Sequence, residues 1–204
     1  MMTDTSESLR QSAIFSCSPS AHGCCDIAAD NFAQGVQAAG GALRGDFLRR
    51  YKIEPCQGCY RCKHDRNRAC YLTKIDHSDS LFQRLYDAPF AFFSAPIYFY
   101  HVPAHFKAWI DRSQCYFLRK EDGDETLNAL PRRKAYVSLC AGRKDGEKLF
   151  EGTLLTLKYF LRIFNFELQE PYLYRGSDAG DPELADTIRQ EMQALGERAW
   201  QESL

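Results

Sequence analysis

The sequence predicts an α/β fold: a doubly wound, five-stranded parallel sheet with helices on both faces. Short apolar runs alternate with stretches of helical periodicity along the 204 residues. The run at 89–95 is almost wholly apolar, as expected for a strand that is buried on both faces. Strands and helices alternate five times, and right-handed crossovers join such units into a parallel sheet. We therefore expect one domain over residues 1–204.

The expected strands fix the part of the fold where ligands bind. They lie at 12–17, within 42–53, at 89–95, at 134–140 and at 166–174. The second strand is the most polar, which favours a place near a sheet edge. Ligands on doubly wound sheets bind at the carboxyl ends of the strands. The three loops that follow strands one, three and four, at 18–25, 96–103 and 141–146, are therefore the expected site.

The expected helices connect these strands. They lie at 25–41, at 76–86, from Pro103 onward, at about 150–164 and at 182–201. Gly40 and Gly41 provide a stop for the first helix, and Asp76 or Ser78 provides a cap for the second. Two segments show no regular period: a cysteine-rich insertion at about 55–74 and a charged surface excursion at about 119–133.

Composition excludes several classes of protein. The chain has 26 basic and 27 acidic residues and a formal net charge of −1, which gives no support for a nucleic-acid or membrane-surface partner. The polar opening segment at 1–12 shows no export signal, and no run approaches the roughly 20 apolar residues of a membrane span. A cytoplasmic protein is predicted. Its nine cysteines then favour metal or redox chemistry over disulfides.

The loop after the first strand has the chemistry of an anion site. A helix starts at about Cys25, and its free N–H groups and dipole favour a negative group. Ser18 and Ser20 add hydroxyl donors, Gly23 allows close backbone approach, and His22 supplies a partial positive charge. On its own, however, the loop fits an ordinary capped connection better, because it lacks the glycine fingerprint of a nucleotide-binding loop.

The loop after the third strand is aromatic. Pro96 and Ile97 lead into Tyr98, Phe99 and Tyr100, whose flat rings at a strand's carboxyl end suit a tricyclic ligand. The alternative is that these rings pack on a neighbouring helix or on a partner subunit. The nearby histidines of this segment fit structural roles better than acid–base catalysis.

Four cysteines form the strongest motif. Cys56, Cys59, Cys62 and Cys70 have the spacing C-x2-C-x2-C-x7-C, which suits a tetrahedral zinc or a [4Fe–4S] cluster. Three cysteines two residues apart are more typical of iron–sulfur loops than of paired zinc knuckles. The alternative is a set of free thiols in one loop. The other five cysteines are scattered: Cys17, Cys24, Cys25, Cys115 and Cys140. Cys17 and Cys140 end strands, and we interpret these two as small apolar fillers.

Taken together, these loops resemble the NADPH-dependent FMN reductase superfamily, and within it the iron–sulfur flavoprotein branch. The resemblance covers about residues 13–173, with the motifs in the family's order. It is carried by Ser18-Pro19, by the four-cysteine run, by Ala95-Pro96-Ile97-Tyr98 and by the K-x-x-x-D-R motif from Lys107 to Arg112.

The resemblance implies a flavodoxin-like sheet that binds FMN and assembles as a homodimer or homotetramer. NAD(P)H or a reduced protein would donate electrons to an unidentified acceptor, with a [4Fe–4S] cluster on the four cysteines as an intermediate carrier. Ser18 and Ser20 would hold the phosphate, and Ala141 and Gly142 would close the far side of the flavin. The residues that would line the flavin are Pro96, Ile97, Tyr98 and Phe99.

Departures from the family pattern keep two alternatives open. Ser20 stands where the family has a basic residue, and Cys24-Cys25 replaces an Asn-Thr pair, so the phosphate would depend on backbone amides and His22. Asp76-His77 replaces an Asp-Asp pair. One alternative is a flavodoxin-like electron carrier, which the nearly neutral charge suits less well than an enzyme. The other is a zinc-stabilised domain without flavin.

Overall fold

A computed structural model describes residues 11–204; the segment 1–10, part of the polar opening in which no export signal is expected, lies outside the described residues. Parallel strands form one sheet in the order β2-β1-β3-β4-β5, and β6 also pairs with β4. The strands are β1 (Ser12–Ser16), β2 (Leu43–Phe47), β3 (Ala91–Pro96), β4 (Arg133–Ala141), β5 (Phe166–Leu168) and β6 (Tyr172–Arg175). The predicted doubly wound parallel sheet is confirmed.

The central strands carry an apolar core on each face of the sheet. Successive side chains of a strand point to opposite faces. Phe92 therefore stacks on Phe32 of the first helix, with ring centroids 4.1 Å apart. Phe93 points the other way and stacks on Phe15, at 5.3 Å. Because β3 is buried on both faces, its run of apolar residues has no polar alternation, as the sequence predicted.

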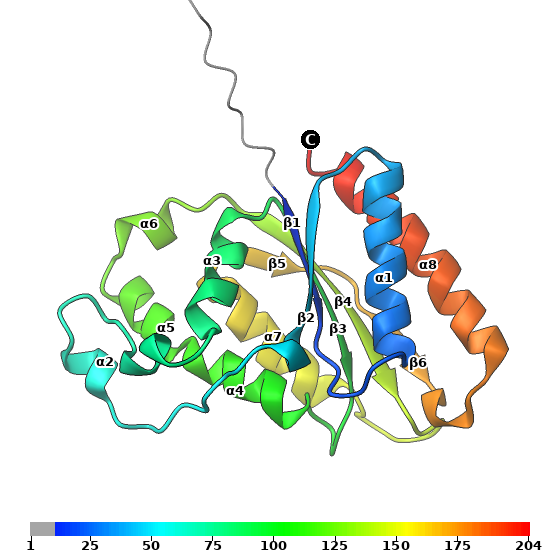
Figure 1. Cartoon of the computed structure of the whole chain (residues 1–204), viewed down its shortest axis with the longest axis horizontal. Coiled ribbons are helices and arrows are strands. Elements are labelled where there is room, and N and C mark those ends of the chain that lie inside the picture. Colours follow the sequence, from blue (N-terminus) through cyan, green and yellow to red (C-terminus); the bar gives the residue numbers. More distant parts are fainter. Residues whose placement is uncertain (1–10) are drawn as a thin grey trace, which may run out of the picture.

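Two layers of helices cover the sheet (Figure 1). One layer consists of α1 (Cys24–Ala38) and α8 (Pro182–Gln201); the other contains α3 (Ser78–Asp87), α4 (Ala104–Arg112), α5 (Gln114–Glu121) and α7 (Glu151–Ile163). The backbones of α1 and α8 touch. A Cβ atom on Gly35 would lie 2.0 Å from the carbonyl oxygen of Gln193, and one on Gly196 would lie 2.1 Å from that of Phe32. Glycine alone permits this approach.

Short helices interrupt the loops. They are the 3₁₀ helices η1 (Leu48–Arg50), η2 (Tyr71–Lys74) and η3 (Ser177–Ala179), and the single turns α2 (Arg61–His64) and α6 (Glu125–Asn128). We expected no regular structure at 119–133. This prediction is wrong, because the segment contains α6. Asp124 caps that turn by accepting the Leu127 N–H at 3.0 Å, and the Leu127 side chain is fully buried.

Two further expectations need correction. The predicted fifth strand at 166–174 is two strands, β5 and β6, which pair with successive stretches of β4. Pro171 lies between them and has no N–H to give to a sheet. The predicted helix from Pro103 is also two, α4 and α5. They meet at Ser113, where both the N–H and the hydroxyl donate to the carbonyl of Ile110.

A buried ion pair anchors the cysteine-rich insertion. Arg112, the last residue of the K-x-x-x-D-R motif, pairs with Asp76, and both side chains are almost wholly buried. The Asp76 carboxylate also accepts the N–H of Glu54 at 2.9 Å and the hydroxyl of Ser78 at 2.8 Å. Burial alone would raise the pKa of Asp76, but these donors and Arg112 lower it overall. Asp76 thus holds the ends of the insertion. The expectation that Asp76 or Ser78 caps the helix is wrong, because the residue at the cap position of α3 is His77.

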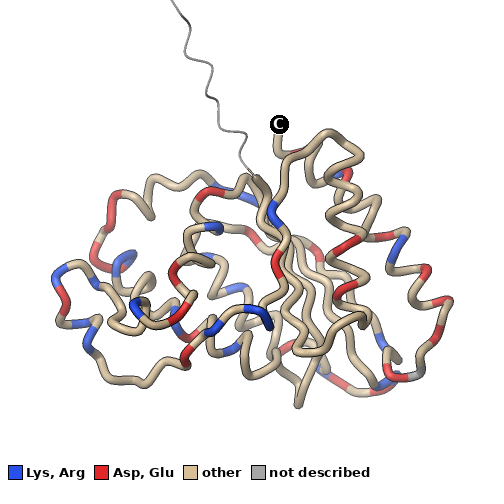
Figure 2. The backbone as a smooth tube through the Cα atoms, viewed as in Figure 1, with Lys and Arg blue, Asp and Glu red and all other residues tan. Residues whose placement is uncertain are grey.

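Charge is mixed over the whole molecule. Figure 2 shows Lys and Arg beside Asp and Glu in both helical layers, in line with the net charge of −1. Within residues 11–204, no helix is long and apolar enough to cross a membrane.

Candidate functional site

The crevice of a doubly wound sheet lies where the strand order reverses, and here that point is between β1 and β3. The chain leaves β1 for α1 on one face and leaves β3 for α4 on the other (Figure 1). The predicted loops at 18–25, 96–103 and 141–146 all follow strands at this carboxyl edge. The structure therefore gathers them at one end of the sheet.

The β1–α1 loop presents uncapped N–H groups. Gly23 precedes the first turn of α1 in an extended conformation, and no side chain caps the helix. The Asp26 N–H of that turn donates to the Gly23 carbonyl at 2.9 Å, and the N–H groups of Cys24 and Cys25 before it favour an anion. Ser20 and His22 are exposed, whereas Ser18 is buried and its hydroxyl accepts the Ser20 N–H at 3.2 Å. His22 has a left-handed φ of 62°.

An ion pair lies beneath this loop. Arg49 makes two hydrogen bonds to the Asp26 carboxylate, at 2.9 and 2.8 Å. Asp26 also accepts the Ser16 hydroxyl at 2.5 Å and the His22 N–H at 2.8 Å. Burial alone would raise the pKa of Asp26, but Arg49, then Ser16 and His22, lower it overall.

Arg49 places a cation beside the β1–α1 loop, which contains no Lys or Arg of its own. Its guanidinium lies 3.5 Å from the Ser18 carbonyl oxygen. Sequence reasoning missed it because the second strand was placed only within 42–53, without an end, whereas β2 ends at Phe47 and Arg49 follows at the carboxyl edge. A basic residue just after that strand was the available signal.

The β3–α4 loop is a tight, strained aromatic turn. The N–H of Tyr98 donates to the carbonyl of His101 at 2.8 Å, and the reverse bond measures 3.0 Å. The two residues between them, Phe99 and Tyr100, have left-handed φ values of 50° and 62°. Bulky residues adopt this conformation at a cost, and such strain gathers at functional sites. Pro96 and Ile97 precede the turn and are half-buried.

The aromatic turn is fixed at its base and open at its tip. The His101 ring hydrogen-bonds the Thr156 hydroxyl of α7 at 3.0 Å. Burial, followed by Lys107, lowers the pKa of His101. Phe99 is fully exposed, and Tyr98 and Tyr100 are about half exposed. The alternative of packing on a neighbouring helix does not apply to Phe99, whose exposed ring is free to stack on a flat ligand.

The end of β4 forms the third side of the edge. Ala141 is buried, and a Cβ atom on Gly142 would lie 2.1 Å from a carboxylate oxygen of Asp178. A larger residue at this position would require the Asp178 side chain to move. The Ile97 N–H donates to the Cys140 carbonyl at 2.8 Å, which joins this end to the aromatic loop. Nothing in the sequence pattern indicates that Asp178 reaches the site.

Three cysteines lie near this edge. Cys25 and Cys140 belong to one buried apolar cluster, and Cys24 packs against it. Hydrogen bonding with Cys140 lowers the pKa of Cys24 to about 6, burial opposes this change, and the Cys24 N–H adds to it. The burial of Cys140 among apolar side chains agrees with its interpretation as a small apolar filler.

The four predicted metal ligands lie elsewhere. Cys56 and Cys59 are exposed, while Cys62 and Cys70 are half-buried against the core. Figure 1 places α2, which carries Cys62, at the outer edge of the helical layer, away from the β1–α1 loop. Among residues 11–204, no three His, Cys, Asp or Glu side chains stand close enough to hold a metal ion. The cluster therefore stays a prediction, without support from this conformation.

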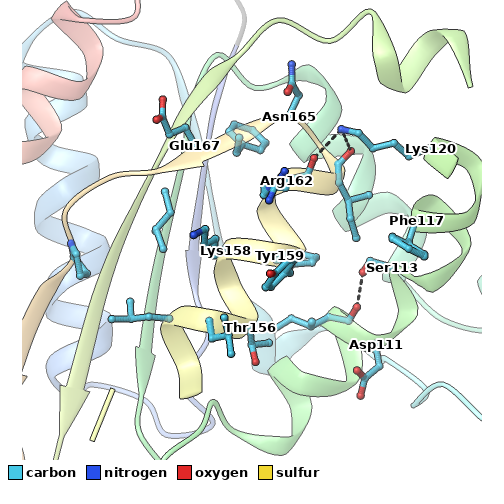
Figure 3. Close-up of a pocket in the computed structure, with 18 of the residues that line it drawn as sticks. Asp111, Ser113, Phe117, Lys120, Thr156, Lys158, Tyr159, Arg162, Asn165 and Glu167 are labelled. Atoms are coloured by element: carbon cyan, nitrogen blue, oxygen red, sulfur yellow. Dashed lines mark hydrogen bonds between the residues drawn. The ribbon is translucent and has the colours of Figure 1, made fainter. Parts of the chain in front are cut away.

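An open groove of about 1550 Å³ runs along α4, α5, α7 and β5. Figure 3 shows Phe117 and Tyr159 over it, and Lys120 bound to backbone carbonyls at its upper end. No residue predicted for a cofactor lines it. Thr156 lines the groove and holds His101, so groove and aromatic turn adjoin.

Comparison with known proteins identifies the fold. A family model described as a flavodoxin-like fold matches residues 17–199. No curated protein matches the chain. Solved structures do: an NAD(P)H:quinone oxidoreductase from Methanothermobacter marburgensis has a TM-score of 0.69 at 18% identity, covering 92% of this chain and 94% of that one.

Two further structures extend the comparison. An FMN-dependent NADH-azoreductase from Bacillus anthracis str. Ames Ancestor, in complex with FMN, has a TM-score of 0.64 at 12% identity, with 93% of this chain and 98% of that one covered. A flavone reductase has a TM-score of 0.69 at 14% identity over 95% of this chain, which spans 63% of that protein. At such identities the likeness concerns the fold.

Proposed function

Because this chain belongs to the family of flavodoxin-like folds, we propose that it is an FMN-dependent oxidoreductase. NAD(P)H or a reduced protein would supply electrons, and a small molecule not yet identified would accept them. One observation carries the proposal: an uncapped helix start and an exposed, strained aromatic turn lie on neighbouring strands at the switch point of the sheet.

The residues at this edge suit the phosphate of FMN. The first turn of α1 offers N–H groups, and Ser20 offers an exposed hydroxyl beside them. Arg49 borders the loop and has N–H groups beyond those that Asp26 holds. Because the Asp26 carboxylate balances the charge of Arg49, the pair would orient a bound phosphate more than it would attract it. The donor set fits a phosphate without the family's basic residue.

The same edge suits the flavin ring. Bound FMN would supply the redox chemistry, and the protein would orient it and exclude water. Tyr98 and Phe99 would stack on the ring, with Pro96 and Ile97 behind them. Ala141 and Gly142 would close the far side, where the Asp178 side chain lies next to Gly142.

Similar folds support the choice of donor and acceptor class. The names of two of the matched structures specify an NAD(P)H:quinone oxidoreductase and an FMN-dependent NADH-azoreductase. We therefore expect turnover of NAD(P)H with a quinone or an azo dye.

The decisive experiment is a titration of the purified protein with FMN, followed by flavin fluorescence, and then an assay of NAD(P)H oxidation. Binding with turnover supports the enzyme. Binding without turnover supports the electron carrier, and failure to bind FMN overturns the proposal. Arg49→Met should weaken binding about tenfold, which corresponds to about 1.4 kcal/mol. Lys52→Met, a nearby exposed cation, is the matched control and should leave it unchanged.

The iron–sulfur cluster is a separate part of the proposal. The four sulfurs do not form one donor set in this conformation, so no step is routed through a cluster. Iron and zinc analysis of anaerobically prepared protein decides the matter. Cys59→Ser should lose the metal and keep the fold. Full iron content in that variant would overturn the ligand assignment.

A homodimer or homotetramer is also proposed from the resemblance. Light scattering of the purified protein would measure the mass against the 23.4 kDa of one chain. A mass of one chain at all concentrations would exclude this state.

A further inference from the structure

One histidine side chain joins two elements of the carboxyl edge. His105 lies in the first turn of α4, and its Nε2 atom is 3.2 Å from the Leu48 carbonyl oxygen and 3.0 Å from that of Tyr51. Because carbonyl oxygens only accept hydrogen bonds, Nε2 carries the proton and shares it between the two. The His105 ring thus bridges the start and the end of one short backbone segment.

The bridged segment is η1, which carries Arg49. Leu48 is the first residue of this turn, and Tyr51 follows its last. Within the turn, the Tyr51 N–H donates to the Leu48 carbonyl at 3.0 Å. Hydrogen bonds of 3₁₀ turns have poorer geometry than those of α-helices. The contacts from His105 therefore add directly to what holds the backbone of Arg49 in place.

The sheet alone does not fix η1 against α4. The strand before η1 is β2 and the strand before α4 is β3, and β1 lies between them in the sheet. Leu48 belongs to the same apolar cluster as Phe106 and Trp109 of α4, so packing brings the two elements together. Apolar packing has no direction. The hydrogen bonds of His105 do, and they set the orientation of η1 on α4.

Arg49 reaches from η1 to the helix start that would hold the phosphate. Its guanidinium hydrogen-bonds Asp26 twice, lies beside the Ser18 carbonyl oxygen, and stands 4.4 Å from the centroid of the Phe47 ring. A guanidinium has more N–H donors than these hydrogen bonds use, and the Arg49 side chain is 18% exposed. It can therefore donate to an anion at the β1–α1 loop as long as η1 keeps its place.

We propose that His105 is a positioning residue for the phosphate of FMN, acting through η1 and Arg49 without touching the ligand. This inference rests on the proposed function and deepens it, because it assigns the edge a preference for a phosphorylated flavin. FMN should bind more tightly than riboflavin, which lacks the phosphate, and His105 should contribute to that difference. A binding group that its supporting hydrogen bonds no longer hold in place loses affinity.

Two amide substitutions isolate the hydrogen bonds of His105. In His105→Gln the side-chain amide reaches the position of Nε2 and still donates, whereas in His105→Asn the same amide is too short. Titrations of the full chain with FMN and with riboflavin, followed by flavin fluorescence, measure the affinities. FMN affinity should stay within about twofold of wild type in His105→Gln and fall about fivefold in His105→Asn. Riboflavin affinity should be the same in both variants and in wild type.

Three results would each contradict the proposal. The first is an unchanged FMN affinity in His105→Asn. The second is an equal fall of the FMN and riboflavin affinities, because damage to the fold alone would lower both. The third is an equal loss of FMN affinity in His105→Gln and His105→Asn, which would exclude the hydrogen bonds of Nε2 as the cause.

A double-mutant cycle tests whether His105 acts through Arg49. In an Arg49→Met background, His105→Asn should cause no further loss of FMN affinity, because the group that it positions is gone. A further loss of about fivefold in that background would overturn the proposal. Failure of the wild-type protein to bind FMN would instead refute the proposed function. Binding of FMN by wild type, with variants that behave otherwise than expected here, would refute the positioning role alone.

Discussion

Two regions of the molecule concentrate cysteine, and they differ in how the chain holds it. The cysteine-rich insertion has four thiols close in sequence, on a loop that turns sharply through left-handed residues at Gly58, Tyr60 and Arg68. The carboxyl edge has Cys24 and Cys140, which are far apart in sequence but lie on α1 and β4 at the same apolar cluster.

The difference shows that spacing in sequence and convergence in space are separate properties. A parallel sheet brings strand ends together whatever the sequence distance, because its register is fixed by packing on both faces. A polar loop has no such constraint. Thiols at the edge therefore gain reactivity from the fold itself, whereas those of the insertion need a ligand or partner to draw them together.

We expect the largest effect from breaking the buried ion pair that anchors the cysteine-rich insertion. Arg112→Met leaves the Asp76 carboxylate buried without its cation, which should cost about 3–5 kcal/mol of stability. Urea unfolding measures the change. Lys107→Met removes an exposed ion pair with Asp111 on the same helix and should cost less than about 0.5 kcal/mol. Equal losses in the two variants would show that the buried pair is not the anchor.

The second effect concerns the ion pair at the edge. Arg49→Met should cost about 2 kcal/mol at neutral pH, since Asp26 loses two charged hydrogen bonds. The folded-state pKa of Asp26 is lowered, so its contribution is present above the unfolded pKa of about 3.9 and is lost as pH falls through the folded value. Wild type should therefore lose more stability on acidification than the variant. Parallel pH profiles of unfolding would contradict this.

The fold was largely predictable from the sequence because its signals are local. The alternating periods, the apolar run around Phe92 and the glycine stop after α1 each depend on neighbouring residues. The split between β5 and β6 does not follow from periodicity, because its local signal is Pro171 and the pairing of the two strands with successive stretches of β4 is a tertiary contact.

The candidate site was predictable in its loops and not in its contacts. The positions of Ser18, Gly23 and Tyr98 follow from strand ends, which the pattern marks. Arg49 and Asp178 act through tertiary neighbours, and nothing in their local sequence specifies those. The same reason explains why Cys140 looked isolated.

A third effect sharpens the contrast between the two groups of thiols. Cys140→Ala removes the hydrogen bond that is the main cause of the low Cys24 pKa, so that pKa should rise. The rate of alkylation of Cys24 by iodoacetamide, followed on the tryptic peptide 11–44 and measured against pH, would then have a higher midpoint than the wild-type value of about 6. Cys115, whose pKa burial raises to about 12, should stay unreactive in both proteins. An unchanged midpoint in Cys140→Ala would assign the low pKa to the helix alone.

The smallest effect tests whether the edge stores strain. Phe99 is fully exposed with a φ of 50°, so Phe99→Gly loses no packing and relieves a left-handed conformation. It should stabilise the protein by about 0.5–1 kcal/mol in urea unfolding while weakening FMN binding. Phe117→Gly makes the same change at an exposed site within α5 and should destabilise by about 1 kcal/mol. If Phe99→Gly also destabilises the protein, the left-handed conformation of Phe99 does not store strain in this turn.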